Sequence, residues 1–140
     1  MDHVGIIVDD LAEAVAFFTD IGLEADDEMT IEGELVDRIV GLDGIRNRVT
    51  MMHSPDGRNC LELIEFSSPP NEPGDPSAPP NTLGLRHITF AVDGIEATIG
   101  RLEARGAELV GEVVRYGDSY ILCYIRGPAG IIVELAEKIG

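Results

Sequence analysis

The sequence of 140 residues lacks tryptophan, and only 5% of its residues are aromatic. This scarcity disfavours a binding pocket built by stacking aromatic rings. Two cysteines are too few for a disulfide framework. No apolar run approaches the roughly 20 residues needed to cross a bilayer, and no signal-peptide pattern opens the chain. We therefore expect a cytoplasmic protein with reduced thiols and no membrane partner.

Positive charge is also scarce. Ten Lys and Arg residues stand against 26 Asp and Glu residues, which gives a formal net charge of −16. Nucleic-acid-binding proteins depend on basic side chains that neutralise phosphates, so we exclude nucleic acid as a partner. The same charge repels anionic membranes and slows the approach of polyanionic substrates. A small molecule is the partner that we expect.

The sequence does contain an internal repeat. An apolar run opens with His3 in the first half and with His87 in the second, 84 residues later. Each half ends with a glycine turn followed by a strand-like run that carries a glutamate, Glu62 in the first half and Glu134 in the second. Each half thus supplies one early histidine and one late glutamate. Repeat-equivalent His and Glu residues suggest a metal site on a pseudo-twofold axis.

Each half predicts the order β-α-β-β-β. Helices are expected where an aspartate precedes a glutamate by three residues and a glycine ends the apolar periodicity. These signals are Asp10, Glu13 and Gly22 in the first half and Asp93, Glu96 and Gly106 in the second. Further strands are expected near 23–29, 34–41, 49–53 and 59–66, and near 108–114, 120–126 and 131–136.

A proline-dense stretch separates the halves and predicts a semi-rigid linker. We expect one domain, 1–140, with module one at 1–66, the linker at 67–83 and module two at 84–140. The linker is long enough for the modules to pair within one chain or to be exchanged between the chains of a homodimer. The sequence leaves both arrangements open.

Strand parity places the four candidate residues. Side chains alternate between the faces of a strand, and the larger apolar set of each strand must lie under the helix. This rule puts His3 and His87 on the face that the helix leaves uncovered, and it puts Glu62 and Glu134 there as well. Small neighbours of the histidines leave room for a cavity.

These residues resemble the vicinal oxygen chelate superfamily, which contains glyoxalase, methylmalonyl-CoA epimerase, extradiol dioxygenases and the bleomycin and fosfomycin resistance proteins. The resemblance rests on Asp2-His3-Val-Gly-Ile, Leu61-Glu62-Leu63, Arg86-His87-Ile and Val133-Glu134-Leu135. It implies an α+β fold in which two βαβββ modules form a curled mixed sheet, a cup with helices outside. It also implies His3, Glu62, His87 and Glu134 as the ligands of one divalent metal ion.

Two imidazoles and two carboxylates suit Zn²⁺, Ni²⁺, Co²⁺, Mn²⁺ or Fe²⁺. The four-ligand pattern resembles glyoxalase and the epimerase, so we expect a metal-dependent lyase or isomerase. Its substrate would be a small molecule with adjacent oxygens that reacts through an enolate, and Glu134, or else Glu62, would accept the carbon proton. The alternative is a non-catalytic protein that binds a drug or metabolite in the cup. An extradiol-dioxygenase-like or fosfomycin-type enzyme is a third hypothesis, disfavoured because those sites lack a ligand equivalent to Glu62.

Overall fold

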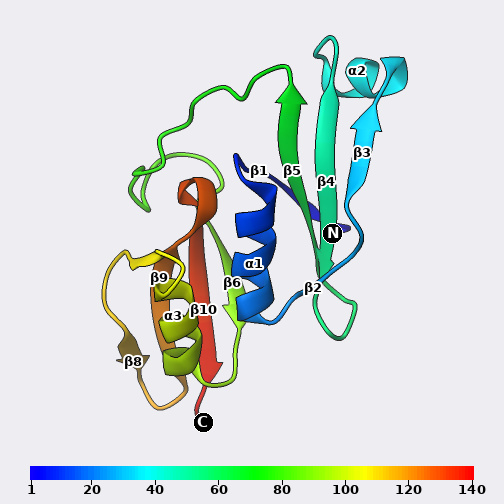
Figure 1. The fold of residues 1–140 in the computed structure, drawn as a ribbon. Helices are drawn as coiled ribbons and strands as arrows, with labels where there is room; N and C mark the ends of the chain where they lie inside the picture. The colour runs from blue at the N-terminus through cyan, green and yellow to red at the C-terminus, as the bar shows by residue number, and fades with distance from the viewer. The chain divides into compact units, whose positions relative to one another are not determined.

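The computed structural model describes all residues, 1–140, and the chain divides into two compact units (Figure 1). The first unit spans Met1–Gly74 and the second spans Asp75–Gly140. The division falls inside the proline-dense linker. No helix is long and apolar enough to span a membrane.

The first unit contains one five-stranded mixed sheet and two helices. Its strands follow the order β1-β5-β4-β2, and β3 also pairs with β4. Strand β1 runs parallel to β5, whereas the other pairs are antiparallel. The elements are β1 (Val4–Ile7), α1 (Leu11–Ile21), β2 (Glu24–Ala25), β3 (Met29–Glu32), α2 (Glu34–Val40), β4 (Arg46–His53) and β5 (Cys60–Ser68).

The second unit repeats this topology. Its strands follow the order β6-β10-β9-β7, β8 also pairs with β9, and only β6 and β10 are parallel. The elements are β6 (His87–Ala91), α3 (Ile95–Glu103), β7 (Glu108–Leu109), β8 (Val114–Tyr116), β9 (Tyr120–Arg126), the short 3-10 turn η1 (Pro128–Gly130) and β10 (Ile132–Lys138). The predicted α+β class with duplicated modules and mixed strand pairing is confirmed, and each module forms its own five-stranded sheet.

Burial alternates along the strands as strand parity predicts. In β1, Val4 and Ile6 are partly buried while Gly5 and Ile7 are exposed. In β5, Leu61 and Leu63 are buried to 4% and 0% exposure and lie on the face against which α1 packs. The opposite face of each sheet, which we call the open face, carries the candidate ligands.

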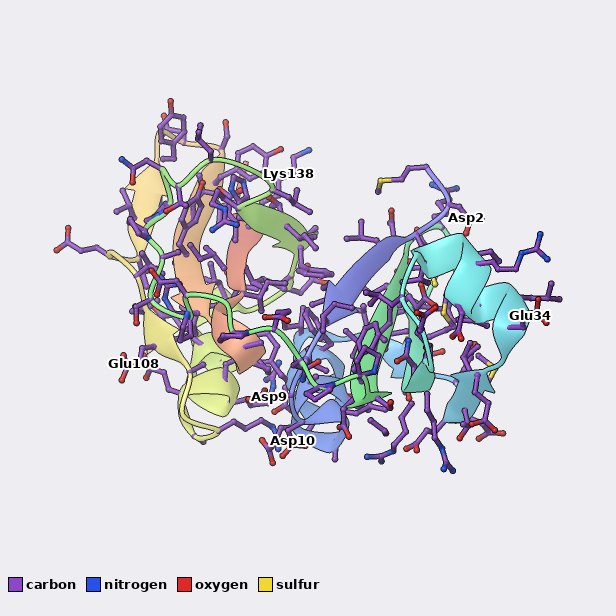
Figure 2. The ribbon with its side chains drawn as sticks, turned by 90° about the horizontal axis from the view of Figure 1, so that it is seen from above. Asp2, Asp9, Asp10, Glu34, Glu108 and Lys138 are labelled. Carbon is purple, nitrogen blue, oxygen red and sulfur yellow. The ribbon has the colours of Figure 1, made fainter.

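Helix α1 begins as predicted, but α3 does not. The Asp10 side chain, labelled in Figure 2, caps α1 by accepting a hydrogen bond from Glu13 N at 3.0 Å. Helix α3 instead starts after Gly94, which has a positive φ of 75° and no capping side chain of its own. The prediction of an aspartate cap at Asp93 is therefore wrong, because the chain enters α3 through a left-handed glycine.

The predicted strand at 34–41 is also wrong, because Glu34–Val40 forms helix α2. Two glycines with positive φ, Gly33 and Gly41, bound the helix. The Asp37 carboxylate accepts hydrogen bonds from Gly44 N and Ile45 N, both at 2.9 Å, and so fixes the turn that follows. The apolar residues here recur at helical spacing and do not alternate, which is the signal that favours helix over strand.

The second half of the linker is held by unit two. The Arg126 guanidinium donates to the carbonyls of Pro76, Ala78 and Gly130 at 3.1, 2.9 and 3.0 Å. Gly130 has φ 78°, and a Cβ at this position would lie 2.4 Å from Pro76 Cα. Only glycine fits this approach, so the linker from residue 75 onward is a packed part of the second unit.

Candidate functional site

Each unit brings one histidine and one glutamate together on its open face. In unit one, Gly5 of β1 lies opposite Glu62 of β5, and His3 lies two residues before Gly5, on the same face. In unit two, Thr89 of β6 lies opposite Glu134 of β10, and His87 again lies two residues earlier. The histidine and the glutamate of each half therefore lie side by side within their own unit.

The pair in unit one is held by an exposed carboxylate. His3 Nε2 lies 3.1 Å from Glu62 Oε2, while His3 Nδ1 contacts Asp2 Oδ2 at 2.6 Å. The hydrogen bond with Asp2, aided by the Glu62 charge and opposed by desolvation, raises the pKa of His3 above its usual value. The same hydrogen bond lowers the pKa of Asp2. Both His3 and Glu62 keep solvent access, with side chains 37% and 27% exposed.

The pair in unit two has different supports. His87 Nε2 lies 3.6 Å from Glu134 Oε2, and that same oxygen accepts a 2.6 Å hydrogen bond from the Thr89 hydroxyl. The Tyr124 hydroxyl lies 3.4 Å from His87 Nδ1, and the two rings pack with centroids 4.8 Å apart. The repeat counterpart of Thr89 is Gly5, which has no hydroxyl to offer Glu62.

These distances fit donors for a divalent ion. Two donors about 2.1 Å from an ion and at right angles to each other lie about 3.0 Å apart. The separations of 3.1 Å in unit one and 3.6 Å in unit two are near this value. In both units Nδ1 of the histidine has a polar partner and Nε2 faces the glutamate, which is the usual orientation of a metal-binding histidine. The structure contains no group of three or more His, Cys, Asp or Glu residues that could hold a metal ion.

The third histidine forms a separate pair on the same sheet. His53 of β4 lies opposite Cys60 of β5, and its Nε2 lies 2.8 Å from Asp26 Oδ2. Burial raises the pKa of the Cys60 thiol, and the Asp2 and Asp26 carboxylates add to this effect. Cys60 is therefore a protonated thiol near neutral pH, which disfavours it as a nucleophile.

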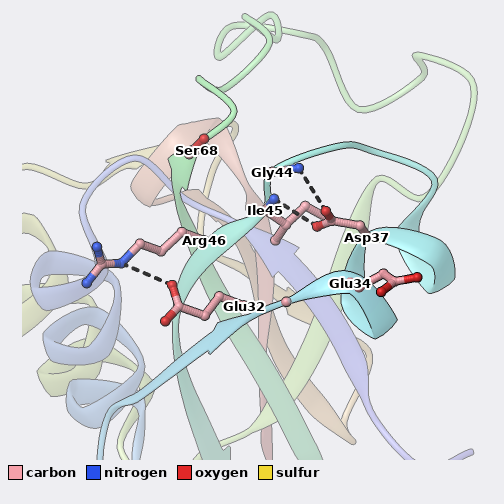
Figure 3. A pocket seen from close by; sticks show the side chains of 8 residues that line it. Glu32, Glu34, Asp37, Gly44, Ile45, Arg46 and Ser68 are labelled. Atoms are coloured by element: carbon pink, nitrogen blue, oxygen red, sulfur yellow. Dashed lines mark hydrogen bonds and ion pairs between the residues drawn. The ribbon is translucent and has the colours of Figure 1, made fainter.

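A pocket of about 670 Å³ lies beside the start of α2 and the start of β4 (Figure 3). Three of its charged groups are engaged, since Asp37 binds backbone amides and Glu32 lies 3.6 Å from Arg46. Arg46, which lines the pocket, lies five positions along β4 from Met51, and Met51 is the residue opposite Glu62. None of the four candidate ligands lines this pocket.

Sequence reasoning did not predict the roles of Glu65 and Glu137. Glu65 accepts a hydrogen bond from Leu11 N at 2.7 Å, and Glu137 accepts from Gly94 N and Ile95 N at 3.2 and 2.9 Å. Each lies three residues after the candidate ligand on the same strand and caps the helix of its unit. The signal that could have revealed these roles is the spacing of three residues between the candidate ligand and the capping glutamate, which is the same in both halves.

Comparison with known proteins finds relatives over nearly the whole chain. A family model for the Glyoxalase/Bleomycin resistance protein/Dioxygenase superfamily matches residues 1–135. The YaeR protein of Escherichia coli K12 is 30% identical over 140 residues, covering 97% of this chain and 94% of its own. A glyoxalase family protein from Bacillus cereus is 44% identical, covers 100% of this chain and 94% of its own, and superposes with a TM-score of 0.96.

A more distant structure contains a metal ion. A FosX variant from Listeria monocytogenes, solved with Mn(II) and 1S,2S-dihydroxypropylphosphonic acid, is 17% identical and has a TM-score of 0.61. The match covers 96% of this chain and 86% of that one, and at this identity it shows a shared fold alone. With the family model matched over both halves, the chain belongs to the glyoxalase/bleomycin resistance/dioxygenase superfamily.

Proposed function

We propose that this protein is a divalent-metal-dependent lyase or isomerase that acts on a small molecule with adjacent oxygens. The observation that carries the proposal is the His–Glu pair repeated in both units, with its donor atoms 3.1 and 3.6 Å apart. His3, Glu62, His87 and Glu134 are the proposed ligands, and the ion is Zn²⁺, Ni²⁺, Co²⁺, Mn²⁺ or Fe²⁺. The Mn(II) bound by a FosX variant of the same fold supports a divalent ion.

The bound ion would act as a Lewis acid that stabilises negative charge on a substrate oxygen. The chain must then supply a base for the proton on the neighbouring carbon. Glu134 is the first assignment and Glu62 the second, since these are the two carboxylates of the His–Glu pairs. Thr89 keeps one Glu134 oxygen engaged at 2.6 Å and leaves the other oxygen free to accept a proton.

Two measurements test this function. Protein purified without a histidine tag should contain about one ion per four-ligand site and lose thermal stability in chelator. The loaded protein should then exchange solvent deuterium into one or more of a panel of 2-oxo and thioester compounds. A protein that takes up no divalent ion would refute the proposal.

A non-catalytic binding protein is the second candidate. Exposed apolar side chains on the open faces of the two sheets favour it, among them Ile7 at 47%, Val114 at 49% and Tyr116 at 70% exposure. A metal-free protein that binds a hydrophobic compound at these strands would support this candidate over the enzyme.

The remaining expectations stand as parts of the proposal. We propose a homodimer, with modules paired within one chain or exchanged between two. We also propose a cytoplasmic location, which the two free cysteines support. The net charge of −16 supports a small-molecule partner and disfavours nucleic acid and membranes.

A further inference from the structure

Helix α2 has no buried face. It spans Glu34–Val40, and none of its residues is buried. A helix of this length is not stable alone, and packing of an apolar face normally supplies the stability. Here the Asp37 carboxylate holds the helix from one side, because it accepts hydrogen bonds from the amides of Gly44 and Ile45 (Figure 3). The other side of α2 is therefore fixed in place and open to a partner.

The open side of α2 is apolar. Leu35 and Ile39 are 70% and 84% exposed, and because they are four residues apart they lie on the same side of the helix. Val40 and Leu42, which follow Ile39 closely in the chain, are also exposed. We call Leu35, Ile39, Val40 and Leu42 the α2 patch. Exposed apolar surface gathered in this way marks a site of interaction with another molecule.

Two charges of opposite sign border the α2 patch. Glu34 and Arg38 precede Leu35 and Ile39 by one residue each, so they too share one side of the helix. Neither charged side chain forms an ion pair or a hydrogen bond within unit one. Because the two charges balance, the helix gives no advantage to a partner of uniform charge. It suits a partner that presents the same two charges in the reverse order.

We infer that the α2 patch is a contact between two copies of this chain, with the two α2 helices antiparallel about a twofold axis. Such an axis brings the same side of each helix together and reverses their directions. Leu35 then packs near the partner's Ile39. Glu34 lies beside the partner's Arg38, and Arg38 beside the partner's Glu34, as charged residues do at the borders of paired helices. The inference does not depend on the proposed metal chemistry, and it assigns a contact surface to the proposed homodimer.

Sedimentation equilibrium tests the apolar part of this contact. The unmodified protein should form the α2-linked assembly at about 100 µM and dissociate on dilution, because the α2 patch is small. Leu35→Ser should raise the dissociation constant at least about tenfold and so halve the mass of the assembly. Leu85→Ser is the matched control, since Leu85 is also 70% exposed but lies in unit two. This control should leave the mass unchanged.

The charged part is tested with Glu34→Arg and Arg38→Glu. Each variant alone places like charges opposite each other across the twofold axis, so each should have half the mass of the unmodified assembly. An equimolar mixture should regain the full mass, because arginine then faces glutamate at every pair across the contact. The like charges within each helix remain in the mixture, so recovery can only report contact between two α2 helices.

Circular dichroism checks that every variant is folded. An unmodified protein that is monomeric at about 100 µM overturns the inference, and so does full mass in Leu35→Ser. Charge variants of reduced mass whose mixture does not recover overturn it as well. If modules are also exchanged between chains, the α2 contact joins two such dimers, and its loss still halves the mass. Metal uptake is measured separately, so failure of the proposed function leaves this test intact.

Discussion

The Thr89 hydroxyl donates a 2.6 Å hydrogen bond to Glu134 Oε2, and no equivalent bond exists in unit one, where Gly5 lies opposite Glu62. The two His–Glu pairs are therefore alike in position and unlike in support. In unit one the additional polar partner is Asp2, and it contacts the histidine. In unit two the additional partner is Thr89, and it donates to the glutamate.

Thr89→Val should weaken metal binding by about tenfold, because outer partners orient the groups that coordinate a metal. Isothermal titration with Mn²⁺ or Zn²⁺ measures the affinity. Thr30→Val, an exposed change on β3, is the matched control and should leave the affinity unchanged. Equal affinities of the Thr89 variant and the unmodified protein would show that the hydrogen bond does not position Glu134.

Glu134→Gln should lower solvent proton exchange into the substrate by a factor of about 10² to 10⁴ while a metal ion remains bound. The amide retains an oxygen for the ion but cannot accept the carbon proton. Glu62→Gln is the matched variant in the other repeat. Whichever change removes exchange identifies the base, and turnover that survives in both variants excludes both glutamates.

The protonation of His3 should depend on Asp2. In the metal-free protein the pKa of His3 lies above the usual value of about 6.5. Its stabilising contribution is thus fully present below that value and is lost as the pH rises through the folded-state pKa. Asp2→Asn should lower the pKa of His3, as read from imidazole carbon shifts in an NMR titration. An unchanged titration curve would contradict the role of Asp2.

Glu137→Ala should destabilise the protein by about 1 to 2 kcal/mol, since it removes the acceptor for two amides at the start of α3. Thermal or urea unfolding measures the loss. Glu96→Ala, in the first turn of the same helix, controls for removal of a negative charge near the helix start. A Glu137 variant as stable as the control would show that the cap contributes little.

Mixing two inactive variants distinguishes the arrangements of the modules. His3→Ala and His87→Ala should each lose metal binding. If modules are exchanged between the chains of a dimer, a mixture refolded together regains about one quarter of the sites, because half of the dimers are mixed and half of their sites are complete. If modules pair within one chain, the mixture regains none. Bound metal after gel filtration decides between them.

Much of the fold was predictable because the repeat constrains it twice. The parity of His3 and Glu62 followed from apolar alternation, and the structure reproduces it. Helix α2 was not predicted, because a seven-residue helix between glycines competes with a strand of the same length. The sequence pattern does not predict that Arg126 binds linker carbonyls, because those contacts join residues about 50 positions apart.

The spacing of Glu62 and Glu65 on β5 ties the site to the fold. Side chains three residues apart lie on opposite faces, so a slip of β5 by one residue would exchange the faces of these two glutamates. The proposed metal ligand and the acceptor at the start of α1 would be lost in a single event. A correctly registered sheet therefore also keeps the proposed ligand on the open face, and the same holds for Glu134 and Glu137 in the second unit.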